Sequence, residues 1–120
     1  MELKGNFYNI NGIERAEDGN YTVNVVLSPE HQIYAGHFPG KPVVPGVCTL
    51  TIIKEIVGEV LGRDVRFDTI KECKYISALV PEKNLGIIVN VALADGEKLR
   101  ASVVKEKGLQ PVLKLRATIK

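Results

Sequence analysis

One long apolar segment stands among shorter segments in which apolar and polar residues alternate, and this contrast limits the possible folds. In residues 47–61, apolar side chains cover most of the circumference of a helix. We therefore predict a long helix here that is buried on most sides, with Gly62 as its C-terminal stop. The polar residues Thr51, Glu55 and Glu59 lie four positions apart, so they share one side of the predicted helix.

The rest of the chain alternates with a period of two, which is typical of strands that bury one face. Short turns, such as the one containing Asp95-Gly96, separate the later segments, as antiparallel neighbours require. We therefore predict one α+β domain over residues 1–120, in which a curved antiparallel sheet wraps around the single long helix. The alternation is weaker in the first and third of the predicted strands, which are 5–15, 21–28, 65–79, 87–93, 99–103 and 113–119.

Composition argues against several classes of function. The net charge is +2 and the basic residues are scattered, which argues against a nucleic-acid partner. No apolar run is long enough to span a membrane and residues 1–5 contain no signal-peptide core, so we predict a cytoplasmic protein without a membrane partner. Cys48 and Cys73 lack metal-ligand spacing and are interpreted as reduced buried thiols. We predict no metal site and no bound cofactor.

A rigid segment precedes the predicted helix, and six of the twelve residues from Gly36 to Val47 are Gly or Pro. Pro45 suits the first turn of a helix, and the N–H groups just after it, at Gly46 and Val47, lack partners within the helix. A carbonyl oxygen placed there would be polarised by these groups and by the helix dipole. His37 then becomes a candidate base for the proton next to that carbonyl, although a structural His in a proline-rich turn is the simpler interpretation.

The sequence His-Phe-Pro-Gly-Lys-Pro-Val-Val-Pro-Gly-Val at residues 37–47 resembles the signature of the bacterial β-hydroxyacyl-acyl-carrier-protein dehydratases of the FabZ/FabA type. The resemblance implies the hot-dog fold, and it implies a dimer, or a higher oligomer, with active sites at the subunit interface. It also implies removal of water from a 3-hydroxyacyl thioester carried on the phosphopantetheine arm of acyl carrier protein. By position, the catalytic residue is His37, and the substrate-binding residues are Phe38, Pro39, Pro45, Gly46 and Val47.

The chain departs from this family at the residue that supplies a carboxylate from the helix. In the family a Glu or Asp lies fourteen positions after the His, and that position is Thr51 here. A hydroxyl can hold a water or bind a substrate hydroxyl, but it cannot act as a carboxylic acid. Glu55 lies about 6 Å further along the helix, and its side chain leans back toward Thr51. We therefore list Thr51 and Glu55 as catalytic candidates linked by a water, with a solvated Glu55 as the alternative.

Three functions follow from these observations. The first is a dehydratase that uses His37 as its base. The second is a catalytically incomplete subunit that binds the acyl thioester and the carrier protein, and forms a hetero-dimer with a related hot-dog subunit that supplies the acid. The third and weaker one is a thioesterase, because one fold hosts several chemistries.

Overall fold

The computed structural model of the chain describes residues 2–17, 19–29, 31 and 43–120. Within these ranges the order of elements matches the prediction of two strands, one long helix and then four strands. The bounds are β1 (Tyr8–Arg15), β2 (Asn20–Leu27), α1 (Gly46–Leu61), β3 (Phe67–Tyr75), β4 (Leu85–Ala94), β5 (Lys98–Lys105) and β6 (Pro111–Ile119).

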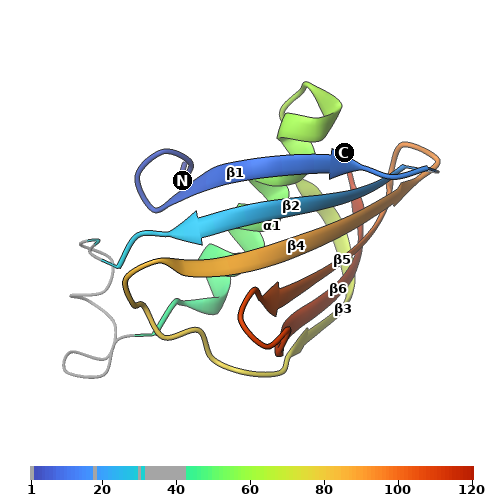
Figure 1. The fold of residues 1–120 in the computed structure, drawn as a ribbon. Helices are drawn as coiled ribbons and strands as arrows, with labels where there is room; N and C mark the ends of the chain where they lie inside the picture. Colours follow the sequence, from blue (N-terminus) through green and yellow to red (C-terminus); the bar gives the residue numbers. More distant parts are fainter. Residues whose placement is uncertain (1, 18, 30, 32–42) are drawn as a thin grey trace.

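The strands form one antiparallel sheet in the order β1-β2-β4-β5-β6-β3, and α1 lies across one of its faces (Figure 1). The chain leaves the sheet after β2, forms the helix, and returns as β3 at the opposite edge. Consecutive hairpins then fill the space between with β4, β5 and β6. One helix held against a curved antiparallel sheet is the hot-dog architecture, so the predicted fold is confirmed.

The core lies between the helix and the inner face of the sheet, which is the face that α1 covers. Ile52, Ile53, Ile56 and Val57 of the helix are fully buried against alternate residues of the strands. Of the residues in α1, Val47 and Glu59 are the exposed ones, which confirms a helix covered on most sides. The exposure of Val47 reaches 59%, although it belongs to the apolar surface that the pattern predicts to be buried.

Two turns adopt the backbone conformation that their sequence predicts. Asp95 and Gly96 both have positive φ values, 56° and 72°, as a tight hairpin between β4 and β5 requires. Gly62 ends the helix in the left-handed region at φ 70°, and its N–H donates to the carbonyl of Gly58. No helix in the described ranges is long and apolar enough to cross a membrane.

The first predicted strand is shorter than its sequence pattern, because the residues before Tyr8 fold into a loop. The N–H of Phe7 donates to the carbonyl of Leu3 at 2.9 Å, and Gly5 has a φ of 93°. Leu3 and Phe7 are buried, although neither lies in a strand. The alternation is weak there because these apolar residues pack in a loop. The third predicted strand also ends early, at Tyr75.

Candidate functional site

The predicted site residues divide into two groups. His37, Phe38 and Pro39 lie outside the described residues, so their catalytic and binding roles remain predictions. Pro45, Gly46, Val47, Thr51 and Glu55 are described, and they lie at the start of α1 or along it.

The start of α1 has backbone donors but no side-chain cap. Pro45 precedes the first helical turn as the N-cap, with φ −60° and ψ 142°, and makes no side-chain capping bond. Its carbonyl accepts hydrogen bonds from the N–H groups of Cys48 and Thr49, at 2.9 and 3.3 Å. Within the described residues, the N–H groups of Gly46 and Val47 have no acceptor, and the first turn contains no acidic residue. This turn can therefore bind and polarise a carbonyl oxygen.

Tyr75, the last residue of β3, packs directly against this turn. It pairs with the buried Leu113 of β6, so its side chain lies on the helix-covered face of the sheet. A Cβ atom added to Gly46 would lie 2.7 Å from Cε1 of the Tyr75 ring and 2.9 Å from its hydroxyl oxygen. Gly46 is therefore needed for a close approach. Sequence reasoning missed Tyr75, because a tyrosine late in a weakly alternating strand carries no functional signal.

A cavity of about 280 Å³ opens beside this contact, between the start of α1, the end of β3 and the start of β6; we call it the inner cavity. Thr49 lines it and is 4% exposed. Within the described part of the chain, the Thr49 hydroxyl has no hydrogen-bond partner. The Ser77 hydroxyl, by contrast, donates to the carbonyl of Pro111 at 2.6 Å. Apolar residues such as Val44 and Leu79 complete the wall, so the cavity combines an apolar wall with the hydroxyl of Thr49.

Thr51 lies one turn after Val47, where the family signature leads to a carboxylate. Its hydroxyl donates to the Val47 carbonyl at 2.8 Å, which is a local bond within the helix. The side chain is half-buried, so it remains close enough to the surface to contact a ligand or a partner. Its catalytic role stays a prediction.

Glu55 is held by the N-terminal loop. Its carboxylate accepts the N–H groups of Leu3 and Lys4, at 2.9 and 3.0 Å, and the hydroxyl of Tyr8 at 2.9 Å. A freely solvated Glu55, which was the alternative, does not fit these contacts, because those with Leu3 and Tyr8 are partly buried. The relay through Thr51 stays untested, and these contacts favour a structural role for Glu55.

The Tyr8 side chain is buried in this contact between α1 and the N-terminal loop. Its burial, followed by the hydrogen bond and charge of Glu55, raises the pKa of Tyr8 far above its ordinary range. One turn further along the helix, Glu59 forms an ion pair with Lys4 at 2.8 Å. The stripe of acidic residues on the helix therefore holds the N-terminal loop in place.

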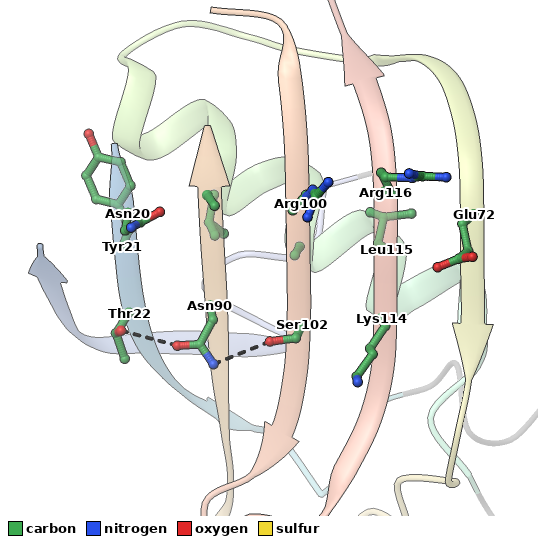
Figure 2. Close-up of a pocket in the computed structure, with 13 residues that line it drawn as sticks. Asn20, Tyr21, Thr22, Glu72, Asn90, Arg100, Ser102, Lys114, Leu115 and Arg116 are labelled. Carbon is green, nitrogen blue, oxygen red and sulfur yellow. Dashed lines mark hydrogen bonds between the residues drawn. The ribbon is translucent and has the colours of Figure 1, made fainter. Parts of the chain in front are cut away.

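A second recess, of about 560 Å³, lies on the outer face of the sheet, opposite α1 (Figure 2). We call it the outer recess. Across its floor the Thr22 hydroxyl donates to the Asn90 amide oxygen at 3.2 Å, and the Asn90 amide nitrogen donates to the Ser102 hydroxyl at 3.4 Å. Arg100 and Arg116 lie opposite one another on adjacent strands. The described residues that line the recess include no His or Cys, and the predicted chemistry does not use it.

A family model described as ApeI-like, ApeI dehydratase, matches residues 13–110 of the chain. The chain belongs to the ApeI-like dehydratase family. Among curated proteins it is 32% identical, over 92% of its length and 75% of the relative's, to the protein named 3-hydroxyacyl-[acyl-carrier-protein] dehydratase FabZ of Clostridium acetobutylicum. Its identity to the protein of the same name from Geobacillus thermodenitrificans is 29%, over 88% of this chain and 75% of that protein.

Solved structures confirm the fold. A chain of the dehydratase heterocomplex ApeI:P from Xenorhabdus doucetiae superposes with a TM-score of 0.78 at 16% identity, over 92% of this chain and 95% of that one. A hypothetical thioesterase protein from Streptococcus pneumoniae TIGR4, in an Asp52Ala mutant form, superposes with a TM-score of 0.64 at 16% identity, over 97% and 91% of the two chains. At these identities the likeness concerns the fold and leaves the reaction open.

Proposed function

We propose that this protein removes water from a 3-hydroxyacyl thioester carried on acyl carrier protein, as a step in the synthesis of fatty acids or related acyl chains. In this reaction His37 takes the proton from C2, and the electron pair of that bond forms the C2=C3 double bond. The C3–O bond breaks, and the hydroxyl leaves as water with a proton that the protonated His37 returns, so the base is regenerated. The products are a 2-enoyl thioester and water.

The observation that carries this proposal is the uncapped start of α1. Negative charge develops on the thioester carbonyl oxygen as C2 loses its proton, and fixed donors stabilise it there. The N–H groups of Gly46 and Val47, which have no acceptor among the described residues, follow shortly after His37 in the sequence. Membership of the ApeI-like dehydratase family supports the same assignment.

The test is a dehydration assay on the purified chain with 3-hydroxyacyl carrier protein. We expect the absorbance of the conjugated enoyl thioester to rise. In His37→Ala the rate should fall by about 10²–10⁴-fold, the usual contribution of a positioned base. His31→Ala is the matched control, because His31 lies outside the signature. Equal rates in the protein and in His37→Ala would contradict the proposal.

A second candidate is favoured by Thr51 and Glu55 together. The hydroxyl of Thr51 cannot supply an acidic proton at neutral pH, and Glu55 is occupied by Leu3, Lys4 and Tyr8. In this version the chain forms a hetero-dimer with a related hot-dog subunit, which provides the acid that protonates the leaving hydroxyl. The named heterocomplex ApeI:P, whose fold this chain shares, supports such an arrangement.

Co-expression distinguishes the two candidates. If the pure chain forms no enoyl product and a co-purified related subunit restores it, the hetero-dimer is supported. Full activity of the pure homo-oligomer contradicts it. Release of free thiol in the same assay would instead indicate the thioesterase alternative. Carrier-protein binding, a cytoplasmic location and the lack of a resident cofactor remain predictions; the described residues contain no cluster of three or more metal-binding side chains.

A further inference from the structure

We infer that Tyr75 is a further substrate-binding residue, whose hydroxyl donates a hydrogen bond to the thioester carbonyl oxygen at the start of α1. This inference rests on the proposed function, because it deepens the description of the same site. It concerns a side chain from β3 that the sequence signature does not include.

The Tyr75 hydroxyl lies beside the start of α1. The Tyr75 oxygen would lie 2.9 Å from a Cβ atom on Gly46, and Gly46 is the first residue of the helix. A carbonyl oxygen that accepts the Gly46 N–H therefore binds beside the phenol. The side chain is 58% exposed, so its hydroxyl end can turn toward a ligand without disturbing the core.

Thr49, in the first turn of α1, supplies a second polar side chain beside Tyr75. Thr49 is 4% exposed, lines the inner cavity together with Tyr75, and its hydroxyl has no partner among the described residues. Among the described residues no buried side-chain oxygen lacks a hydrogen-bond partner, so the Thr49 hydroxyl oxygen is accessible from the inner cavity, where it can bond to a ligand oxygen. The substrate has two oxygens close together, the carbonyl and the 3-hydroxyl. Tyr75 and Thr49 line one cavity and thus provide polar groups for both.

The phenol donates this hydrogen bond only in its protonated state. Burial raises the pKa of Tyr75, and the hydrogen bond and charge of the neighbouring Cys73 thiol raise it further, so a ligand oxygen would take the place of this thiol as the partner of the phenol. The phenol therefore keeps its proton throughout the neutral range and remains a donor. Cys73 pairs with the buried Leu115 as Tyr75 pairs with Leu113, so both side chains lie on the inner face.

The experiment compares Tyr75→Phe with the unaltered protein. Phe keeps the ring that packs on Gly46 and removes only the oxygen. Loss of a single donor to a developing oxyanion typically costs about 10²-fold in turnover, and we expect a fall in kcat of that order. Tyr21→Phe is the matched control, because Tyr21 lines the outer recess. We expect it to leave kcat unchanged.

A readout other than turnover separates this inference from the proposed function. The carbonyl stretch of bound 3-hydroxyacyl pantetheine, measured by infrared difference spectroscopy, reports the hydrogen bonds to that oxygen. We expect it to move to higher frequency in Tyr75→Phe and to stay unchanged in Tyr21→Phe.

The outcomes are distinct. If the protein binds the thioester without dehydrating it, the proposed function fails, and the infrared shift still decides the role of Tyr75. If it dehydrates the thioester and Tyr75→Phe changes neither kcat nor the stretch, the inference about Tyr75 is wrong and the proposed function stands. A protein that neither binds nor dehydrates overturns both.

Discussion

The two faces of the sheet differ in the number of their polar side chains and in what these side chains contact. On the helix-covered face polar groups are few among the described residues, and each has a specific setting: the Thr49 hydroxyl at the inner cavity, the Tyr75 phenol against Gly46, and the Glu55 carboxylate under the N-terminal loop. On the outer face many polar groups lie side by side, either bonded to one another, as Asn90 is, or solvated. The difference teaches that packing of α1 and the N-terminal loop sets the surroundings of each polar group on the inner face, whereas on the outer face polar side chains bond to one another.

Thr51→Glu should give the largest effect, because it places a carboxylic acid where the helix now has a hydroxyl. We expect turnover by the pure chain to rise by about 10²-fold or more, the contribution of a positioned acid. The enoyl absorbance assay measures it. Ser102→Glu, which adds the same group to the outer recess, is the control and should change nothing. No gain in Thr51→Glu would mean that the missing acid does not limit the rate.

Glu55→Gln should separate stability from catalysis. The charged acceptor holds two backbone N–H groups and the Tyr8 hydroxyl, and hydrogen bonds to charged groups each contribute about 1.5–3 kcal/mol. We expect the free energy of unfolding in urea to fall by about 2 kcal/mol, with unchanged kcat for the folded protein. Glu59→Gln loses an exposed ion pair with Lys4 and should cost less than about 1 kcal/mol. A large fall in kcat in Glu55→Gln would instead restore the relay through Thr51.

Gly46→Ala should displace the Tyr75 ring from the inner cavity without unfolding the protein. The added methyl lies 2.7 Å from the Tyr75 ring, which is the far end of a side chain that can swing away. Because the phenol is then displaced, we expect kcat to fall by about tenfold, part of the contribution of one donor. Gly12→Ala is the control, since a Cβ there meets nothing within 4 Å. Unchanged kcat would show that the contact with Tyr75 is only structural.

The raised pKa of Tyr8 should make the free energy of unfolding depend on pH in the alkaline range. Its pKa is raised in the folded state, so above its ordinary value of about 10 the unfolded chain loses this proton while the folded chain keeps it. Stability should therefore fall by about 1.4 kcal/mol per pH unit above that point. Urea unfolding between about pH 9 and 11, the range in which an ordinary Tyr titrates, measures how the free energy of unfolding changes with pH. Tyr8→Phe should flatten this dependence; an unchanged slope would contradict the buried hydrogen bond to Glu55.

Arg100→Gln should have the smallest effect. Arg100 lies opposite Arg116, and neither forms an ion pair with a carboxylate in the described residues. Removal of one like charge should change stability by less than about 0.5 kcal/mol, in the favourable direction if at all. Thermal unfolding and the enoyl assay together check it. A marked loss of activity would contradict the assignment of the reaction to the inner face alone.

Local patterns were enough to predict the elements. Alternation along residues 87–93 and 113–119 reflects one buried face, and the apolar run in 47–61 reflects a helix that the sheet covers. These patterns depend on neighbours two to four residues apart, so they can be read from the chain. The segment before Tyr8 was harder, because its apolar residues pack in a loop.

The site was predictable only where one segment carries it. The start of α1 follows from Pro45 and Gly46. The contact of Tyr75 with Gly46 joins residues from two elements, and so does the contact of Glu55 with Leu3. The spacing of residues within one segment gives no sign of such contacts, because they depend on how the helix settles on the sheet.

The place of β3 at the edge of the sheet has a consequence for how the protein is made. Among the described strands β3 pairs with β6 alone, and β6 follows all the others along the chain. While the chain is still on the ribosome, Tyr75 has no strand to hold it beside the helix until Leu113 has emerged. Long-range pairing of this kind is slow to form. The contact of Tyr75 with the start of α1 should therefore form only after β6 has been synthesised, and a chain cut short before residue 111 should present β3 as an unpaired edge prone to aggregation.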